Sequence, residues 1–321
     1  KEVIAEAAGT EIGQLEEELI KEGVSRDEVH RLCDLHLEVF KESLGKAGVA
    51  TSPGHPIHIL MEEHRAIQEL VDERRDVTKG LLEASDPASI GERTKKLNHV
   101  AEQLETSEKH YQREENILFP YLEKHGVTEP PAIMWMEHDK IRGLRKNIRR
   151  LSDTRQNMSL QEFAKQLHEL STSVSEMISK HFYKENNILF PTALKVIPED
   201  EWKDIREQFD EIGYCSFTPK ASIVPMREVV ALSSRSKEQD RIAFETGALS
   251  TREIEAIFNT LPVDITFVDR DDTVRYFSQS KDRIFVRTKA VIGRKVQQCH
   301  PQKSVHIVDK LLDDLKSGRR G

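Results

Sequence analysis

The sequence contains few cysteines and no cysteine pair. Its 321 residues include only Cys33, Cys215 and Cys299, and none of them belongs to a Cys-x-x-Cys motif. An odd number of widely separated cysteines argues against a disulfide framework or a zinc ribbon. Such cysteines are typical of proteins of the reducing cytoplasm, and we expect this protein to be cytoplasmic.

Long apolar runs are also missing. No stretch approaches the roughly 20 apolar residues that a membrane-spanning helix needs, and the N-terminus lacks the basic start and apolar centre of a signal peptide. The net charge of −8 at pH 7 has the wrong sign for a general nucleic-acid binder. We therefore expect neither a membrane nor a nucleic acid as a partner. Phosphate loops, dinucleotide fingerprints and nucleophile elbows are absent too, which leaves kinase and conventional hydrolase functions without support.

Histidine, in contrast, is abundant, with 13 residues, and four long stretches between residues 55 and 195 show the apolar period of an α-helix. On one face of each stretch, one histidine takes a place among the apolar residues: His64, His110, His138 and His181. Segments rich in Pro, Asp and Ser separate the stretches. The pattern predicts a mainly α fold, with an up-down-up-down four-helix bundle over residues 54–212 that includes a short fifth helix near 199–211.

The flanking sequences have different patterns. Residues 1–50 predict a helical hairpin that forms an N-terminal helical domain. Residues 213–250 mix proline, serine and charge with little periodicity, and they predict a connector. Over residues 251–321, a short helix, two strands around an Asp-Asp turn and a last helix predict a small α+β segment.

An internal repeat is the strongest signal in the sequence. Residues 110–120 read HYQREENILFP and residues 181–191 read HFYKENNILFP, with seven of eleven positions identical. A weaker pair relates residues 61–67 to residues 135–141. In each half, a helix with one inward histidine precedes a helix with a His-x-x-x-Glu motif. The bundle is therefore predicted to consist of two related helical hairpins.

The His-x-x-x-Glu spacing has a chemical meaning. Its two side chains lie one turn apart on the same helix face, so both reach one point in the bundle core. A carboxylate on an apolar face is costly unless it is compensated, and two facing carboxylates repel each other. Metal cations remove both costs, and imidazole with carboxylate suits iron and, to a lesser degree, manganese. We predict six metal ligands: His64, His110, Glu114, His138, His181 and Glu185.

Neighbouring residues are weaker candidates. A single histidine on an apolar face is ordinarily a core residue, but four in a repeated order with two glutamates favour a metal site. Glu115 corresponds to Asn186 in the repeat, so we expect Glu115 to face water. His55 and His58 are minor alternatives as ligands, because His58 lies on a different helical face from His64. Cys33 and His36 share a helix face, where a buried cysteine beside a partly buried histidine is the ordinary explanation and a metal or redox site is the alternative.

The order His64, His110-x-x-x-Glu114, His138, His181-x-x-x-Glu185 resembles the hemerythrin-like, HHE cation-binding family over about 140 residues. The resemblance implies a non-haem di-iron centre with Glu114 and Glu185 bridging two iron ions, although zinc or manganese can occupy such a site in a purified sample. Oxygen-carrying hemerythrins use a fifth histidine and end in His-x-x-x-x-Asp, a pattern that this chain lacks. The ligand set looks more like bacterial iron-cluster repair di-iron proteins and hemerythrin-like sensors.

The implied ligands do not fill two octahedral ions. Four imidazoles and two bridging carboxylates supply eight bonds, and an oxo or hydroxo bridge supplies two more. About twelve bonds are needed, so about two positions stay open for a small gas such as oxygen or nitric oxide.

The C-terminal segment resembles the start of a PAS domain, in residues 261–269 and in Cys299-His300-Pro301 before a helix. A helical N-terminal domain, an HHE bundle and a PAS domain, in this order, are similar to a prokaryotic family of uncharacterised function. We expect a protein signalling partner and a homodimer contact through the PAS-like part. Cys299 and His300 are minor candidates for haem ligation in a PAS pocket, since a turn before a helix is the simpler explanation.

Three functions follow from these features. The first is a sensor of oxygen, nitric oxide or the redox or iron state that relays its signal through the PAS-like domain. The second is a di-iron enzyme of nitric-oxide or oxygen reduction, or of iron–sulfur cluster repair. The third and weakest is iron storage or sequestration, because six ligands hold two ions rather than a mineral.

Overall fold

The structure is a computed structural model, and it describes residues 19, 20, 23, 24 and 28 together with residues 51–224, 241–244, 247–279 and 286–319. Apart from five positions, the predicted helical domain over residues 1–50 lies outside the described residues, as do Cys33 and His36. The chain divides into two compact units, Lys1–Met226 and Arg227–Gly321, which are described separately here. None of the described helices is both long enough and apolar enough to cross a membrane.

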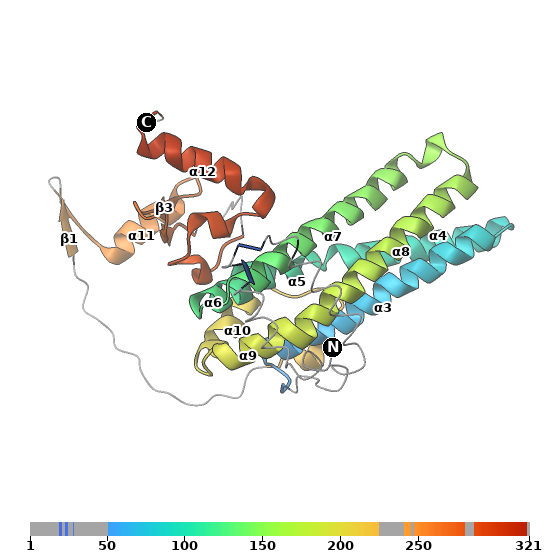
Figure 1. Ribbon diagram of the computed structural model, residues 1–321, viewed down its shortest axis with the longest axis horizontal. Helices are drawn as coiled ribbons and strands as arrows, with labels where there is room; N and C mark the ends of the chain where they lie inside the picture. The colour runs from blue at the N-terminus through green and yellow to red at the C-terminus, as the bar shows by residue number, and fades with distance from the viewer. Residues whose placement is uncertain are drawn as a thin grey trace. The chain divides into compact units, whose positions relative to one another are not determined.

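The first unit is the predicted four-helix bundle. Its long helices lie side by side along their length (Figure 1), and they are α3 (Pro56–Glu83), α4 (Pro87–Glu105), α7 (Glu129–Asp153) and α8 (Leu160–Lys184). Side chains close the N-termini of three of them. Asp86 accepts from the amide of Ser89 before α4, Ser159 from that of Glu162 before α8, and His55 Nδ1 from that of Ile57 before α3. Such caps satisfy amides that have no partner within the helix.

The second predicted helix is interrupted. α4 ends at Glu105, and α5 (Glu108–Arg113) begins after a turn in which Ser107 Oγ donates to the carbonyl of Leu104 at 2.6 Å. The chain continues through α6 (Phe119–Lys124) and returns along α7 and α8, which the short helix η3 (Arg155–Asn157) joins. α9 (Phe190–Val196) and α10 (Glu201–Ile212) complete the helices, and α10 is the predicted fifth helix. Residues 213–224, with the short helix η5 (Lys220–Ser222), follow directly.

Each half of the bundle contains a π-helix one turn after the histidine of its His-x-x-x-Glu motif. These are η2 (Glu114–Leu118) and η4 (Glu185–Leu189), and each begins at the predicted glutamate ligand. In a π-turn a carbonyl loses its i+4 amide partner. The side-chain amide of Asn116 donates to the carbonyl of Gln112, and that of Asn187 to the carbonyl of Tyr183, both at 2.8 Å. The asparagine shared by both repeats therefore stabilises the widened turn.

Two apolar clusters divide the bundle interior along its length. Leu60 and Met134 belong to the first cluster, which also contains Trp202 and Phe209 of α10. Ile67, Ile141 and Ile178 belong to the second. Along α3 and α7, the inward histidine follows a residue of the first cluster and precedes one of the second. The polar residues of the predicted site thus form one layer between two apolar layers.

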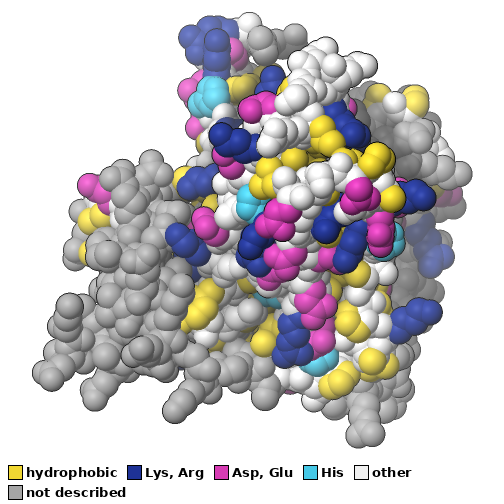
Figure 2. Space-filling view, turned by 90° about the vertical axis from the view of Figure 1, so that its right-hand side faces the viewer, with side chains coloured by type: hydrophobic (Ala, Val, Ile, Leu, Met, Phe, Trp, Pro, Cys, Tyr) yellow, Lys and Arg dark blue, Asp and Glu magenta, His cyan; other side chains and the backbone are white. Residues whose placement is uncertain are grey.

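Outside the polar layer, charged side chains of both signs lie on the surface of the molecule. Figure 2 shows Lys and Arg side chains interleaved with Asp and Glu over the face that it presents. On α7, for example, Arg142 pairs with Glu108 and Arg149 with Glu105. The basic residues of this helix are therefore partly neutralised by acidic neighbours on α4 and α5.

The second unit is the predicted small α+β segment. β3 (Thr266–Val268) pairs antiparallel with β4 (Val274–Phe277), with Thr266 opposite Phe277. The helices α11 (Thr251–Thr260) and α12 (Gln302–Lys316) and the short helices η6 (Lys289–Val291) and η7 (Val296–Cys299) surround this pair. Val274, Phe277, Val291 and Val296 form its small core. An antiparallel pair that we did not predict, β1 (Arg241–Phe244) and β2 (Gly247–Ser250), lies within the segment that we interpreted as a connector.

Candidate metal centre

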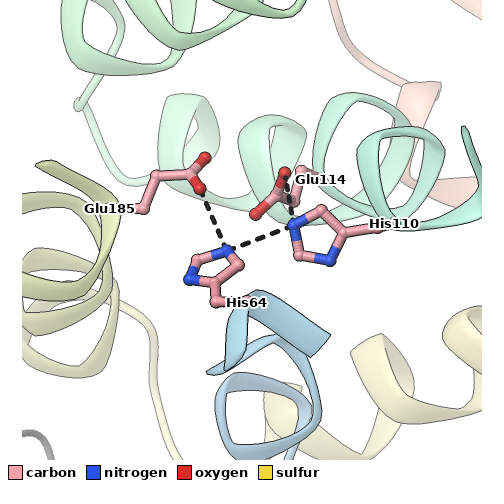
Figure 3. Close-up of side chains that lie close together, drawn as sticks. All are labelled: His64, His110, Glu114 and Glu185. Atoms are coloured by element: carbon pink, nitrogen blue, oxygen red, sulfur yellow. Dashed lines mark hydrogen bonds and ion pairs between the residues drawn. The ribbon is translucent and has the colours of Figure 1, made fainter. Parts of the chain in front are cut away.

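The six predicted ligands converge in the polar layer of the bundle. Six different elements supply one ligand each, and no ligand is more than 3% exposed. The set comes from α3 (His64), α5 (His110), the start of η2 (Glu114), α7 (His138), α8 (His181) and the start of η4 (Glu185). Figure 3 shows four of them turned toward one another.

The ligand atoms form two overlapping groups. His64, His110, Glu114 and Glu185 place one atom each within 4.8 Å of one another, and Glu114, His138, His181 and Glu185 do the same. Both carboxylates belong to both groups. This arrangement suits two ions, each with two histidines, and two shared carboxylates. We call the proposed ion site beside His64 and His110 the first position, and the site beside His138 and His181 the second position.

The individual distances support this division. At the first position, His64 Nε2 lies 3.1 Å from Glu185 Oε2 and 3.2 Å from His110 Nε2. At the second position, His138 Nε2 lies 3.4 Å from Glu114 Oε2, and His181 Nε2 lies 3.3 Å from Glu185 Oε1. Each glutamate thus contacts histidines of both helical hairpins.

The donor atoms fit cations better than any hydrogen-bonded arrangement among themselves. All four carboxylate oxygens of Glu114 and Glu185 are buried without a hydrogen-bond partner, as are Nε2 of His138 and Nε2 of His181. Buried polar atoms nearly always have a partner, because leaving one unpaired costs several kcal/mol, more for a charge. Two divalent cations would satisfy these six atoms together.

An acceptor behind each histidine, on the side away from the proposed ions, fixes the orientation of its ring. Nδ1 of His110 donates to Glu63 at 2.8 Å, and Nδ1 of His181 donates to Glu137 at 2.7 Å. The remaining two rings form bonds of the same kind: His138 with Glu115 at 2.8 Å and His64 with Asn186 at 2.9 Å. A proton on Nδ1 leaves the lone pair of Nε2 free for a metal, which is the usual role of such outer partners.

Our prediction that Glu115 faces water was wrong. Its side chain is 7% exposed, and it accepts hydrogen bonds from His138 and from Arg142 at 2.7 Å. Sequence reasoning also missed Glu63 and Glu137. A signal for these two exists, because each directly precedes an inward histidine in the weaker repeat.

Basic side chains neutralise the carboxylates that accept from the histidines. Arg113 pairs with Glu63, and Lys184 Nζ lies 2.5 Å from Glu137 Oε1. These two basic residues occupy equivalent positions of the repeat. Burial alone would raise the pKa of Glu63, but Arg113 and His110 lower that pKa to about 2. Glu63 therefore stays ionised and paired with Arg113 at every physiological pH.

The metal-free ligands hold protons where metal ions would bind. Burial lowers the pKa of His181, but the charge of Glu185 and the hydrogen bond to Glu137 raise it to about 9. In the same way, the nearby carboxylate of Glu114 and the hydrogen bond to Glu115 overcome burial and raise the pKa of His138 well above its usual value. For His64 burial prevails, and its pKa is lowered.

Metal binding is therefore expected to strengthen as the pH rises toward 9. Below the raised pKa of His138 and His181, protons occupy these ligands and compete with the metal, so binding at pH 7 must release on the order of two protons. Titration calorimetry in buffers of different ionisation enthalpy measures this release. An affinity for divalent metal that is unchanged between pH 6 and pH 9 would contradict the protonation states described above.

Aromatic rings cover the imidazoles and exclude water from the centre. Phe182 stacks on His64 with ring centroids 3.8 Å apart, and Phe119 stacks on His138 at 5.8 Å. Tyr111, the repeat counterpart of Phe182, lies 4.6 Å from His138 and is 1% exposed. Apolar walls of this kind strengthen every electrostatic interaction inside the site.

The minor candidates lie apart from these groups. His55 caps α3 and packs against Trp202 with ring centroids 4.5 Å apart, and burial with the nearby His58 lowers its pKa to about 4. His58 is half-buried on α3. Cys299 and His300 lie in the second unit, at the end of η7. Among the described residues, neither metal-suited group includes any of these four.

Comparison with known proteins agrees with the architecture that we predicted. Residues 55–193 match the hemerythrin HHE cation binding domain, residues 254–321 match the PAS domain, and residues 1–46 match a family of unknown function. No curated protein matches the chain. A crystal structure of a C-terminal domain from Streptococcus mutans is 36% identical, over 26% of this chain and 65% of that chain, with a TM-score of 0.25. The match thus spans less than two thirds of that relative.

Proposed function

We propose that the bundle over residues 54–212 holds a non-haem di-iron centre, and that the protein senses oxygen, nitric oxide or the redox or iron state. The mixed imidazole and carboxylate ligands favour iron. Bound iron would supply reversible gas binding and redox chemistry at its open positions. The PAS-like domain would pass the signal to a protein partner or to a second copy of the chain.

One observation carries the sensor proposal: residues that follow the bundle bind directly to Glu63, the carboxylate that orients His110. Thr218 Oγ1 donates to Glu63 Oε1 at 2.6 Å, while Oε2 of the same Glu63 accepts from His110 Nδ1. Arg113 joins Glu63 to the carbonyl of Gly213. Cys215 between these contacts is 5% exposed. The chain segment 213–218, which leads toward the second unit in sequence, is thus anchored on a partner of a ligand histidine.

The protein residues can transmit a local change along this path. One carboxylate oxygen of Glu63 accepts from His110 and the other accepts from Thr218. A change in the strength of the His110 bond therefore changes the negative charge on the oxygen that binds Thr218. A small movement at His110 would then shift segment 213–218. Coupling through contiguous hydrogen bonds of this kind requires a demonstrated response at the far end.

Thr218→Val is expected to uncouple segment 213–224 from the centre without loss of metal. The variant keeps the bonds of Glu63 to His110 and Arg113, so metal content should stay unchanged. Hydrogen exchange on the full chain should show that loading with ferrous iron, or exposure to nitric oxide, changes protection of residues 213–224 in the native protein, and at least threefold less in the variant. Thr192→Val is the control, because Thr192 is also buried but donates to the carbonyl of Ile188. An equal response in the Thr218 variant would sink the proposed relay.

A second function, an enzyme of nitric-oxide or oxygen reduction or of iron–sulfur cluster repair, is favoured by the open positions that remain after the six ligands are counted. The apolar walls of Phe182 and Phe119 would protect a reactive centre from water. Gas consumption by the reduced, iron-loaded protein tests this function. A rate no higher than that of free iron, together with an intact exchange response, would leave the sensor as the function.

A further inference from the structure

The two metal positions differ in the groups that hold their histidines. At the second position both rings donate to carboxylates, His138 to Glu115 and His181 to Glu137. At the first position His110 donates to the carboxylate of Glu63, but His64 donates to the neutral amide oxygen of Asn186. The repeat explains where the difference lies, because Glu115 and Asn186 occupy equivalent positions.

A further residue pair extends this difference outward. Arg142 binds both oxygens of Glu115, with Nη1 to Oε1 at 2.7 Å and Nη2 to Oε2 at 3.0 Å. This two-point contact fixes the carboxylate in front of His138. The repeat counterpart of Arg142 is Gln68, whose side-chain amide donates to Asp72 at 3.0 Å. The charged residues Glu115 and Arg142 beside the second position thus correspond to the neutral amides Asn186 and Gln68 beside the first.

The chemical effect follows from the acceptor. An ionised carboxylate attracts the Nδ1 proton more strongly than an amide oxygen does, so it increases electron density on the imidazole and makes Nε2 a better ligand. Three of the four histidines have this support, and His64 does not. The difference therefore acts at the first position alone.

We propose that the two positions are inequivalent, so that the second position binds a divalent cation more tightly than the first, and that Glu115 and Asn186 are the positioning residues that set the difference. The inference rests on the proposed di-metal centre and goes beyond it. Loss of outer carboxylates of this kind typically weakens metal binding by about 10- to 100-fold, and we expect a difference of this size between the two positions.

Two variants of the full chain, used as backgrounds, each disable one position so that metal binding at the other can be measured. His64→Ala keeps the two histidines of the second position, and His181→Ala keeps those of the first. Cobalt(II) is the probe, because its visible absorption reports an ion bound by imidazole. Anaerobic titration of each metal-free variant gives the affinity of one position, and the His64→Ala chain should bind cobalt about 10- to 100-fold more tightly than the His181→Ala chain.

Two isosteric substitutions then exchange the outer groups. Glu115→Gln should weaken cobalt binding about 10-fold or more in the His64→Ala chain and leave the His181→Ala chain nearly unchanged. Asn186→Asp should strengthen binding by a similar factor in the His181→Ala chain and leave the His64→Ala chain unchanged. A purely structural role would move both backgrounds together. The control is Glu108→Gln, which removes another partner of Arg142 at 2.7 Å without contact to a ligand histidine.

The outcomes separate the inference from the proposed function. Absence of cobalt binding in the native chain and in both backgrounds overturns the metal centre itself. Binding with equal affinity at the two positions, or a response of both backgrounds to Glu115→Gln, overturns the inequivalence and leaves the metal centre in place. Thermal unfolding of each metal-free variant shows whether it is folded, and the two substitutions give opposite expected signs, so a folding defect in one leaves the other as a test.

Discussion

Replacing Glu114 with alanine is expected to remove both metal ions from the chain. Glu114 belongs to both groups of ligand atoms, and its two oxygens are buried without a hydrogen-bond partner. The substitution therefore takes one bond from each position at once. Metal analysis of the purified protein should fall from two ions per native chain to none in the variant.

Thermal unfolding supplies a second measurement for Glu114→Ala. A thousandfold excess of metal over its dissociation constant stabilises a native protein by about 4 kcal/mol, and the variant should lose this gain. Without metal, the difference between the two chains should shrink, because the stabilisation by bound metal is then absent from both. Glu108→Ala is the control, since Glu108 lies on α5, directly before η2, but pairs with Arg142 at the surface. Retention of two tightly bound ions by Glu114→Ala would refute the ligand assignment.

Arg113→Met is expected to destabilise the bundle by about 3–5 kcal/mol, the usual cost of leaving one partner of a buried ion pair alone. Arg113 and Glu63 are both fully buried, and the guanidinium also lies 5.5 Å from the ring of Phe209 and 5.0 Å from that of Tyr214. The methionine fills the space but leaves the charge of Glu63 uncompensated. Urea unfolding of the metal-free protein measures the loss, and tryptophan fluorescence reports the bundle alone because both tryptophans belong to it.

Arg113→Lys is the matched variant, because the equivalent position of the other half is already Lys184, paired with Glu137. It should recover a large part of the stability that methionine loses. Arg65→Met controls for the loss of an arginine, since Arg65 is exposed on α3 and pairs with its neighbour Glu62. Its effect should stay within about 0.5 kcal/mol. A loss in Arg113→Met no larger than in Arg65→Met would show that Glu63 is neutral in the folded protein.

The sequence indicated the candidate ligands more clearly than the residues that hold them in place. Buried histidines and glutamates on apolar faces stand out, because polar residues there need a reason. Comparison of the two halves, however, identifies only residues that occur at equivalent positions in both. Glu115 acts in one half, so its replacement by Asn186 suggested an exposed residue although the structure buries it against His138. Its burial depends on the packing of α7 against η2, which no local pattern contains.

Local geometry was also partly hidden. The break at Ser107 leaves the apolar stripe intact, because the buried Val100 and Leu104 of α4 are followed by the buried Tyr111 of α5. A π-helix differs from an α-helix by one residue in a turn, so η2 and η4 leave no periodic signal. Their only trace is the asparagine that both repeats share, Asn116 and Asn187. The strands β1 and β2 span four residues each, too few for alternation to be recognised.

The repeat has a consequence for assembly. His64 and His110 come from the first helical hairpin, but their group also needs Glu185 of the second hairpin. In the same way, the group of His138 and His181 needs Glu114 of the first hairpin. Neither hairpin alone offers a full ligand set. The centre joins two halves that are related to each other as the subunits of a dimer are. Residues 125–128, between α6 and α7, are the tether that presents each half to the other at an effective concentration on the order of millimolar. Chelating the metal therefore removes one set of bonds between two partners that the apolar layers and the chain still hold together.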